Sequence, residues 1–286
     1  MKRINIPIKY SPDDLYDELL EKGSYNEIFI QNLLRNNIKS VYATKEILSG
    51  KQLEIEIYPE FFKGQAGAPV KKKVNKDVQD NLNDKNARKQ VNRLIECNFT
   101  VNDIWITLTY NQDKRPEDMK SAIKNMQNFI RRINYRRKKL GLSKCRYIYI
   151  TEHSPDSKIP WHHHMIMDGD MDRDIIEECW KLGDRIETKK LVPDENGLVG
   201  MANYITKCRE KSQKRWNSSV GLIKPKVTVN HYKFKRKKVH NMVLNQNIIQ
   251  ELMEDTYKNY KYTESEVRHN NFNGYWYIYT RMRRRE

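Results

Sequence analysis

The sequence predicts a mixed α+β fold, and three observations carry that prediction. The segment WITLTY, Trp105–Tyr110, is rich in β-branched and aromatic residues, as strands are. A helical stripe follows it, and the alternating segments CRYIYITEH and WHHHMIM come next. The order strand, helix, strand, strand, helix, strand, helix is typical of a central antiparallel sheet of the split βαβ type, with helices packed on it and additions at both ends of the chain.

The 286 residues are enough for one large domain or two smaller ones. We expect three segments: an N-terminal region over residues 1–95, a core over 96–225, and a basic C-terminal extension over 226–286 that packs on the core. A sequence repeat of fixed period is absent.

The N-terminal region is expected to contain a hairpin and a helix. Leu53, Ile55 and Ile57 alternate with polar residues after the turn signal Ser49-Gly50, which predicts paired strands. The following FFKGQAGAPVKKK is typical of a linker or an exposed DNA-facing loop. From about residue 75 to 97 the apolar positions fit a helix with a polar outer face.

The helix of the core is expected to begin at Pro116, with Glu117 and Asp118 in its first turn, where acids favour the helix dipole. Its apolar stripe ends before Gly141 and consists of Met119, Ile123, Met126, Ile130 and Ile133. Beyond the WHHHMIM strand we expect a short helix at DRDIIEECWKLG, a strand at RIETKKL and a helix at LVGMANYITKCREK. The tail adds the basic run HYKFKRKKVH, a helix at NQNIIQELMED and a last strand at YWYIYTRM.

A net charge of +17 favours polyanionic partners, with nucleic acid first. An anionic membrane surface is disfavoured because the chain has no apolar run of membrane-spanning length and its start lacks the apolar part of a signal peptide. We therefore expect a cytosolic protein. The four widely spaced cysteines form no C-x-x-C pair, which indicates free, mostly buried thiols.

Strand alternation divides the three consecutive histidines of WHHHMIM. His162 and His164 share one face with Ile166, whereas His163 lies on the apolar face with Trp161. The two imidazoles on the first face are about 7 Å apart along the strand, so both can reach one cation. We predict His162 and His164 as metal ligands and His163 as a packing residue.

Glu152 is the predicted third ligand. Nine residues separate it from His162, enough for a turn that brings the two strand ends together. His153 takes its place if the register slips by one, and a surface glutamate is the other interpretation. Two histidines and one carboxylate leave positions open for substrate oxygens, and a phosphate substrate favours Mg²⁺ or Mn²⁺, although zinc would tolerate the site.

A nucleophile is expected on the helix LVGMANYITKCREK. Tyr204 lies at the rim of its apolar stripe, and Lys207, three residues on, stands on the same side. Rim packing also explains such a pair when it occurs alone.

With these residues in order, the chain resembles the HUH superfamily of endonucleases, through TLTY, the His-x-His strand and the Tyr-x-x-Lys helix. More narrowly, SGKQLEIEIY, FTVNDIWITLTY, YIYITEHS, WHHHMIM, ANYITK, KRWNSSVGLIKPKV and YWYIYTRMRRR resemble rolling-circle replication initiators of plasmids and phages of Gram-positive bacteria. The resemblance runs from about residue 40 to the end and implies an RRM-like core.

The resemblance implies a nickase. A metal held by His162, His164 and Glu152 would polarise the scissile phosphate of single-stranded or hairpin origin DNA, and Tyr204 would attack it to give a 5′-phosphotyrosine link. Lys207 would stabilise charge on the phosphate or lower the pKa of the tyrosine. Expected DNA contacts are the motif residues Thr107, Thr109 and Tyr110 and the basic residues Lys235, Arg236, Lys237 and Lys238.

The chain departs from initiators with two tyrosines one turn apart, since Gly200 and Cys208 flank Tyr204 at that spacing. A single-tyrosine enzyme closes the circle with a second subunit in a homodimer, a second nucleophile or water. Without a G-x-x-x-x-G-K-[ST] motif, unwinding is expected from a host helicase or origin supercoiling, and synthesis from a host polymerase, in the bacterial cytoplasm.

Two other functions fit the same residues. A transposase or conjugative relaxase would use the same chemistry. A non-catalytic nucleic-acid-binding protein would hold a structural Zn²⁺, which needs a fourth ligand such as His153 or His231.

Overall fold

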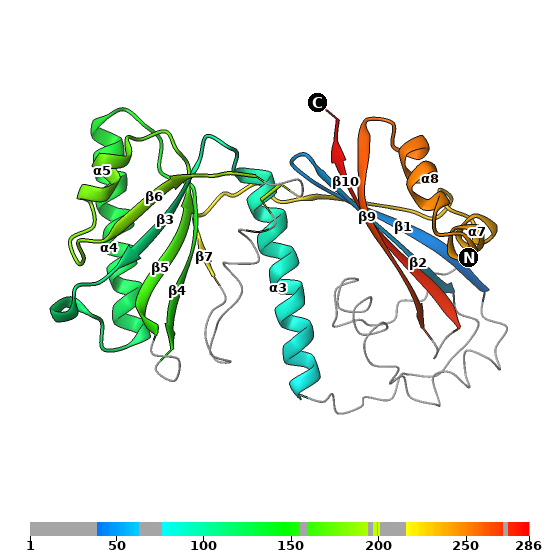
Figure 1. Cartoon of the computed structure of the whole chain (residues 1–286), viewed down its shortest axis with the longest axis horizontal. Helices are drawn as coiled ribbons and strands as arrows, with labels where there is room; N and C mark the ends of the chain where they lie inside the picture. The colour runs from blue at the N-terminus through cyan, green and yellow to red at the C-terminus, as the bar shows by residue number, and fades with distance from the viewer. Residues whose placement is uncertain are drawn as a thin grey trace. The chain divides into compact units, whose positions relative to one another are not determined.

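The computed structural model describes residues 39–62, 76–154, 159–193, 197, 198, 200, 216–270 and 274–285. The fold is a mixed α+β fold, as predicted, with two antiparallel five-stranded sheets (Figure 1). The chain divides into two compact units. One contains residues 87–224, and the other combines residues up to 86 with those from 225 onward.

The first unit contains sheet B, with the strand order β6-β3-β5-β4-β7. Its strands are β3 (Ile104–Thr109), β4 (Tyr147–Ser154), β5 (Ile159–Met167), β6 (Ile186–Lys190) and β7 (Asn217–Ser218). β5 is antiparallel to both β3 and β4 and lies between them. Helix α4 (Met119–Lys139) connects β3 to β4, so the predicted split βαβ arrangement is confirmed.

Helices cover both faces of sheet B. On one face α4 and α5 (Arg173–Glu178) pack over a core that includes Leu108, Met165 and Met167. On the other face the C-terminal half of α3 (Lys76–Asn98) brings Val91 and Ile95 against strand residues, as expected for the predicted helix. Alternate side chains of one strand therefore enter different cores.

Helix α4 begins later than predicted. A short 3₁₀ turn, η1 (Gln112–Lys114), precedes it, and its N-cap is Asp118, whose carboxylate accepts a hydrogen bond of 2.7 Å from the backbone N–H of Ser121. The prediction of Pro116 as the first helical residue was wrong, because an aspartate cap satisfies a free N–H group of the first turn and fixes the start there.

The second unit contains sheet A, with the strand order β8-β1-β2-β10-β9. The predicted hairpin forms β1 (Lys39–Ser49) and β2 (Gln52–Phe62), and Gly50 turns between them with φ of 56°. The other strands are β8 (Lys226–Asn230), β9 (Tyr260–Asn270) and β10 (Tyr275–Arg284). Helices α7 (Arg236–Leu244) and α8 (Ile248–Thr256) contribute Val239, Met242, Ile249 and Met253 to the core on one face (Figure 1).

The division into units differs from the three expected segments. β10 pairs with β2, so the ends of the described chain share one sheet instead of forming separate additions. Helix α7 and strands β8 and β9 were not predicted. Whether the C-terminal segment packs on the core stays a prediction.

The predicted helix LVGMANYITKCREK lies almost entirely outside the described residues. In the part of the chain that the structure describes, no helix is both long and apolar enough to cross a membrane. Cys97, Cys145 and Cys179 are free thiols, and the last two are buried, while Cys208 lies outside the described residues.

Candidate metal centre

Strand pairing brings the three predicted metal ligands together. In the β4–β5 ladder Glu152 lies directly opposite His162, and His164 follows on the same face of β5. The side-chain ligand atoms of Glu152, His162 and His164 all lie within 4.8 Å of one another. The face is the one that α3 covers farther along the strands, where Ile150 and Ile166 are buried.

The distances suit a single ion. Glu152 Oε2 lies 2.9 Å from His162 Nε2 and 3.7 Å from His164 Nε2. Two donor atoms bound at about 2.1 Å to one ion are about 3.0–3.4 Å apart at octahedral to tetrahedral angles. The observed distances lie on either side of that range, so small side-chain movements would let all three atoms bind a common ion.

Each histidine has its Nδ1 engaged elsewhere. His162 Nδ1 lies 2.9 Å from the carbonyl oxygen of Pro160, to which it can only donate. His164 Nδ1 lies 3.3 Å from Thr107 Oγ1, which also accepts a hydrogen bond of 3.2 Å from Trp105 Nε1. A hydroxyl oxygen can accept from both donors. With Nδ1 carrying the proton, Nε2 has its lone pair free for a metal, which is the usual arrangement around ligating histidines.

The pKa values of the two histidines are shifted in opposite directions. Burial lowers the pKa of His162, but hydrogen bonds to Glu152 and to the Pro160 carbonyl, together with the charge of Glu152, raise it above the ordinary value overall. Burial and the neighbouring His162 lower the pKa of His164 to about 4. At neutral pH His164 is thus a ready neutral ligand, whereas a proton on His162 occupies the position that a cation would take beside Glu152.

His163 faces the opposite core. It is fully buried, and its Nε2 and Nδ1 lie 2.6 Å from the hydroxyl of Tyr110 and 2.9 Å from that of Thr151. Burial lowers its pKa to about 3. Both ring nitrogens are therefore occupied by hydroxyl groups, as a packing residue requires.

The alternative ligands lie elsewhere. The ring of His153 stacks on Trp161 with ring centroids 4.1 Å apart, and its Nδ1 contacts the carbonyl of Ile159. His231 pairs with Glu60 in the other unit. Among the described residues neither joins Glu152, His162 and His164, so the structure offers no fourth protein ligand for a closed zinc site there.

The residues of the TLTY motif have internal partners. Thr109 donates to the carbonyl of Arg185 at 2.7 Å, and Thr107 supports His164. Tyr110 was expected to contact nucleic acid, but only 7% of it is exposed and its hydroxyl bonds His163, so in this structure it is a core residue. Burial raises the pKa of Tyr110 to about 12.

The sequence did not assign Thr107 and Trp105 to the support of a metal ligand. The signal is their spacing, since alternate β3 residues share the face of His162 and His164 once β3 is paired with β5. Tyr204 and Lys207 lie outside the described residues. Of the predicted basic contacts, Lys235, Arg236 and Lys237 are exposed and Lys238 is half-buried, all in the unit of sheet A.

Comparison with known proteins gives one match. The sequence profile of the replication-associated protein ORF2 family matches residues 103–212, which include Glu152, His162, His164, Tyr204 and Lys207. No curated protein and no solved structure matches the chain significantly. Over the segment that carries the candidate metal centre, the chain is therefore similar to replication-associated proteins, which supports a role as a replication initiator.

Proposed function

We propose that this protein nicks and rejoins single-stranded DNA at a replication origin, using a divalent ion and a tyrosine nucleophile. The observation that carries the proposal is the convergence of Glu152, His162 and His164 within 4.8 Å, inside the segment similar to replication-associated proteins. The net charge of +17 suits a DNA substrate.

The ion would be Mn²⁺ or Mg²⁺, held by Nε2 of His162 and of His164 and by the carboxylate of Glu152. When bound it would supply Lewis-acid stabilisation of the scissile phosphate. The chain's own contribution is to present two neutral imidazoles: Pro160 and Thr107 keep the Nδ1 protons in place, so that both Nε2 atoms face Glu152.

Tyr204 is the proposed nucleophile. Its phenol loses a proton, its oxygen bonds to phosphorus, the bond from phosphorus to O3′ breaks, and O3′ takes up a proton. The products are a 5′-phosphotyrosine and a free 3′-hydroxyl for a host polymerase. Because the ester bond is retained, attack by a 3′-hydroxyl can rejoin the strand without ATP. Lys207 stabilises charge on the phosphate.

The single tyrosine makes a homodimer the simplest way to close a replicated circle, and unwinding falls to a host helicase. A transposase or relaxase could use the same site, but the similarity to replication-associated proteins favours the initiator.

The test is incubation with Mn²⁺ and labelled single-stranded oligonucleotides that tile the DNA flanking the gene, followed by denaturing electrophoresis. We expect a covalent adduct that EDTA prevents and that Tyr204→Phe and His162→Ala both abolish, with a rate loss of at least about 10³-fold for several kcal/mol of lost stabilisation. Tyr232→Phe, at an exposed tyrosine, is the matched control and keeps the adduct. An adduct that survives in Tyr204→Phe would rule out this nucleophile, and no adduct on any oligonucleotide would rule out the nickase.

A further inference from the structure

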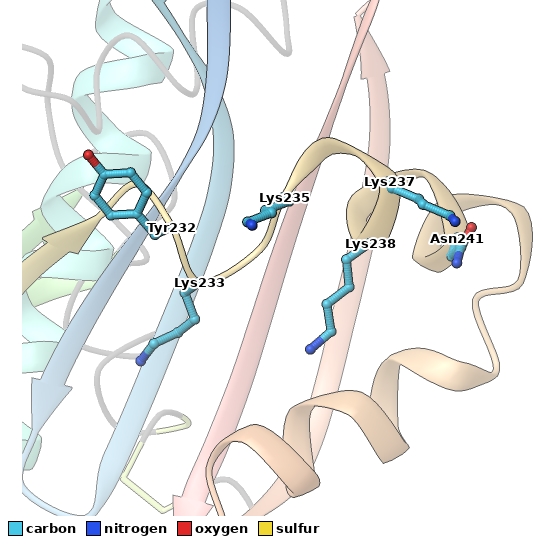
Figure 2. Close-up of a pocket in the computed structure, with 6 residues that line it drawn as sticks. All are labelled: Tyr232, Lys233, Lys235, Lys237, Lys238 and Asn241. Atoms are coloured by element: carbon cyan, nitrogen blue, oxygen red, sulfur yellow. The ribbon is translucent and has the colours of Figure 1, made fainter.

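A basic hollow lies in the unit of sheet A, at the start of α7, with a volume of about 350 Å³ (Figure 2). It is formed by the segment before α7 and by the first turns of that helix. Its lining residues are Tyr232, Lys233, Lys235, Lys237, Lys238 and Asn241.

Only part of the positive charge in this hollow is neutralised. Lys233 forms an ion pair with Glu46, and its ammonium group lies 4.7 Å above the ring of Tyr257. No carboxylate among the described residues pairs with Lys235, Lys237 or Lys238. The hollow therefore presents three uncompensated charges, which favour an anionic ligand.

The lysines form a row. Lys235 is the N-cap residue of α7 and Lys238 follows three residues later, so the two share a side of the helix. The Lys238 ammonium group lies 5.0 Å from the ring centre of Phe234, which holds its stem in place. Figure 2 shows Lys233 and Lys238 extending in the same direction from the backbone, and Lys237 beside Asn241. A row of ammonium groups suits successive phosphates of a polymer better than a single small anion.

Tyr232 adds an aromatic surface at the same place. It is 81% exposed, although its neighbour Phe234 is fully buried. Bases of an unpaired strand stack on exposed aromatic rings between basic residues, whereas the bases of a duplex are already stacked on each other. The combination of Tyr232 with the three lysines thus favours a single strand.

We propose that this hollow binds the backbone of single-stranded DNA, with phosphates on Lys235, Lys237 and Lys238 and a base stacked on Tyr232. The choice of DNA as the polyanion rests on the proposed function, but the binding itself needs no cleavage. The hollow would hold a stretch of the substrate strand in a unit other than the one with the metal centre.

The lysines are tested by fluorescence anisotropy with the full chain, a labelled mixed-sequence single strand, and EDTA to prevent cleavage. We expect the triple variant K235Q/K237Q/K238Q to bind at least tenfold more weakly and to lower the slope of log affinity against log salt by about 2, at about 0.7 per phosphate contact. The control K226Q/K258Q/K261Q removes the same charge at exposed lysines outside the hollow and should lose less than about threefold, because distant charges are screened. Equal losses in the two variants would overturn the site.

The stacking contact is tested with Tyr232→Ala and Tyr232→Phe on the single strand and on a duplex of the same sequence. We expect alanine to weaken single-strand binding about tenfold and to leave duplex binding unchanged, while phenylalanine keeps both affinities. An unchanged single-strand affinity, or an equal loss on the duplex, would overturn the assignment to a single strand. A wild-type protein that binds in this assay but never forms the adduct would contradict the nickase and leave the hollow standing.

Discussion

The two faces of strand β5 carry histidines in opposite surroundings. On one face His163 is fully buried, with both ring nitrogens bonded to hydroxyl groups. On the other face His162 and His164 each engage only Nδ1 in this way and direct Nε2 toward Glu152. An imidazole with two satisfied nitrogens has nothing left for a metal, whereas an imidazole held by Nδ1 alone is prepared to bind one.

Adjacent residues of one type can thus serve packing and chemistry, and the number of hydrogen bonds to each ring decides which. The comparison predicts that substitutions on the two faces will separate stability from metal binding.

The largest effect that we expect is a loss of stability in His163→Ala. The substitution leaves a cavity and removes the partners of two buried hydroxyls, of Tyr110 and Thr151, at a cost of about 3 kcal/mol in the free energy of unfolding. Urea denaturation followed by circular dichroism measures the loss.

The matched control is His162→Ala on the other face, which should cost less than about 1 kcal/mol because the side chain is partly exposed and contributes to no apolar core. At temperatures where His163→Ala is still folded, it should keep its Mn²⁺ stoichiometry and His162→Ala should not. If both variants lost stability to the same extent, the two faces would not differ as described.

Period-two alternation predicted this division of the histidines because it follows from backbone geometry alone. The short connection from β4 to β5 also predicted the pairing of Glu152 with His162, since a hairpin fixes its own register. Local rules were sufficient where the interacting residues are close in the sequence.

Longer-range features were not predictable in the same way. The partner of β2 is β10, with Ile57 opposite Ile278, and nothing in either segment specifies the other. Helix α7 was missed because its basic residues conceal a short apolar stripe of Val239 and Met242. Tyr110 was predicted to lie at the surface because its burial depends on His163, far along the chain.

A smaller effect is expected from Thr107→Val. Valine has the same shape but no oxygen to accept the Nδ1 proton of His164, so the orientation and tautomer of that ligand are less well fixed. We expect Mn²⁺ affinity to fall about 10- to 100-fold without DNA present, as measured by isothermal titration calorimetry.

Thr109→Val is the control, because that hydroxyl lies on the same strand but bonds to the carbonyl of Arg185. It should change Mn²⁺ affinity less than about twofold, in line with a surface substitution. An equal loss in both variants would show that the strand, and not the hydrogen bond to His164, determines the affinity. An unchanged affinity in Thr107→Val with weaker DNA binding would restore Thr107 as a DNA contact.

The smallest effect concerns pH and distinguishes the two ligands on the same face. The pKa of His162 is raised above its ordinary value and that of His164 is lowered to about 4. A metal must displace the proton of His162, so affinity should be constant above the raised pKa and should fall as the pH drops through it, about tenfold per unit for one proton. His164 stays neutral through that range and contributes no second proton.

Mn²⁺ titrations between pH 5 and 8 should therefore give a limiting slope of one in log affinity against pH. A slope of two would mean that His164 also takes up a proton, and that the two imidazoles are not divided by their hydrogen bonds. In Glu152→Gln the carboxylate that raises the His162 pKa is gone, so the fall should move to lower pH even though the affinity is weaker throughout. A fall that stayed at the same pH would show that the Pro160 carbonyl, and not Glu152, holds the proton on His162.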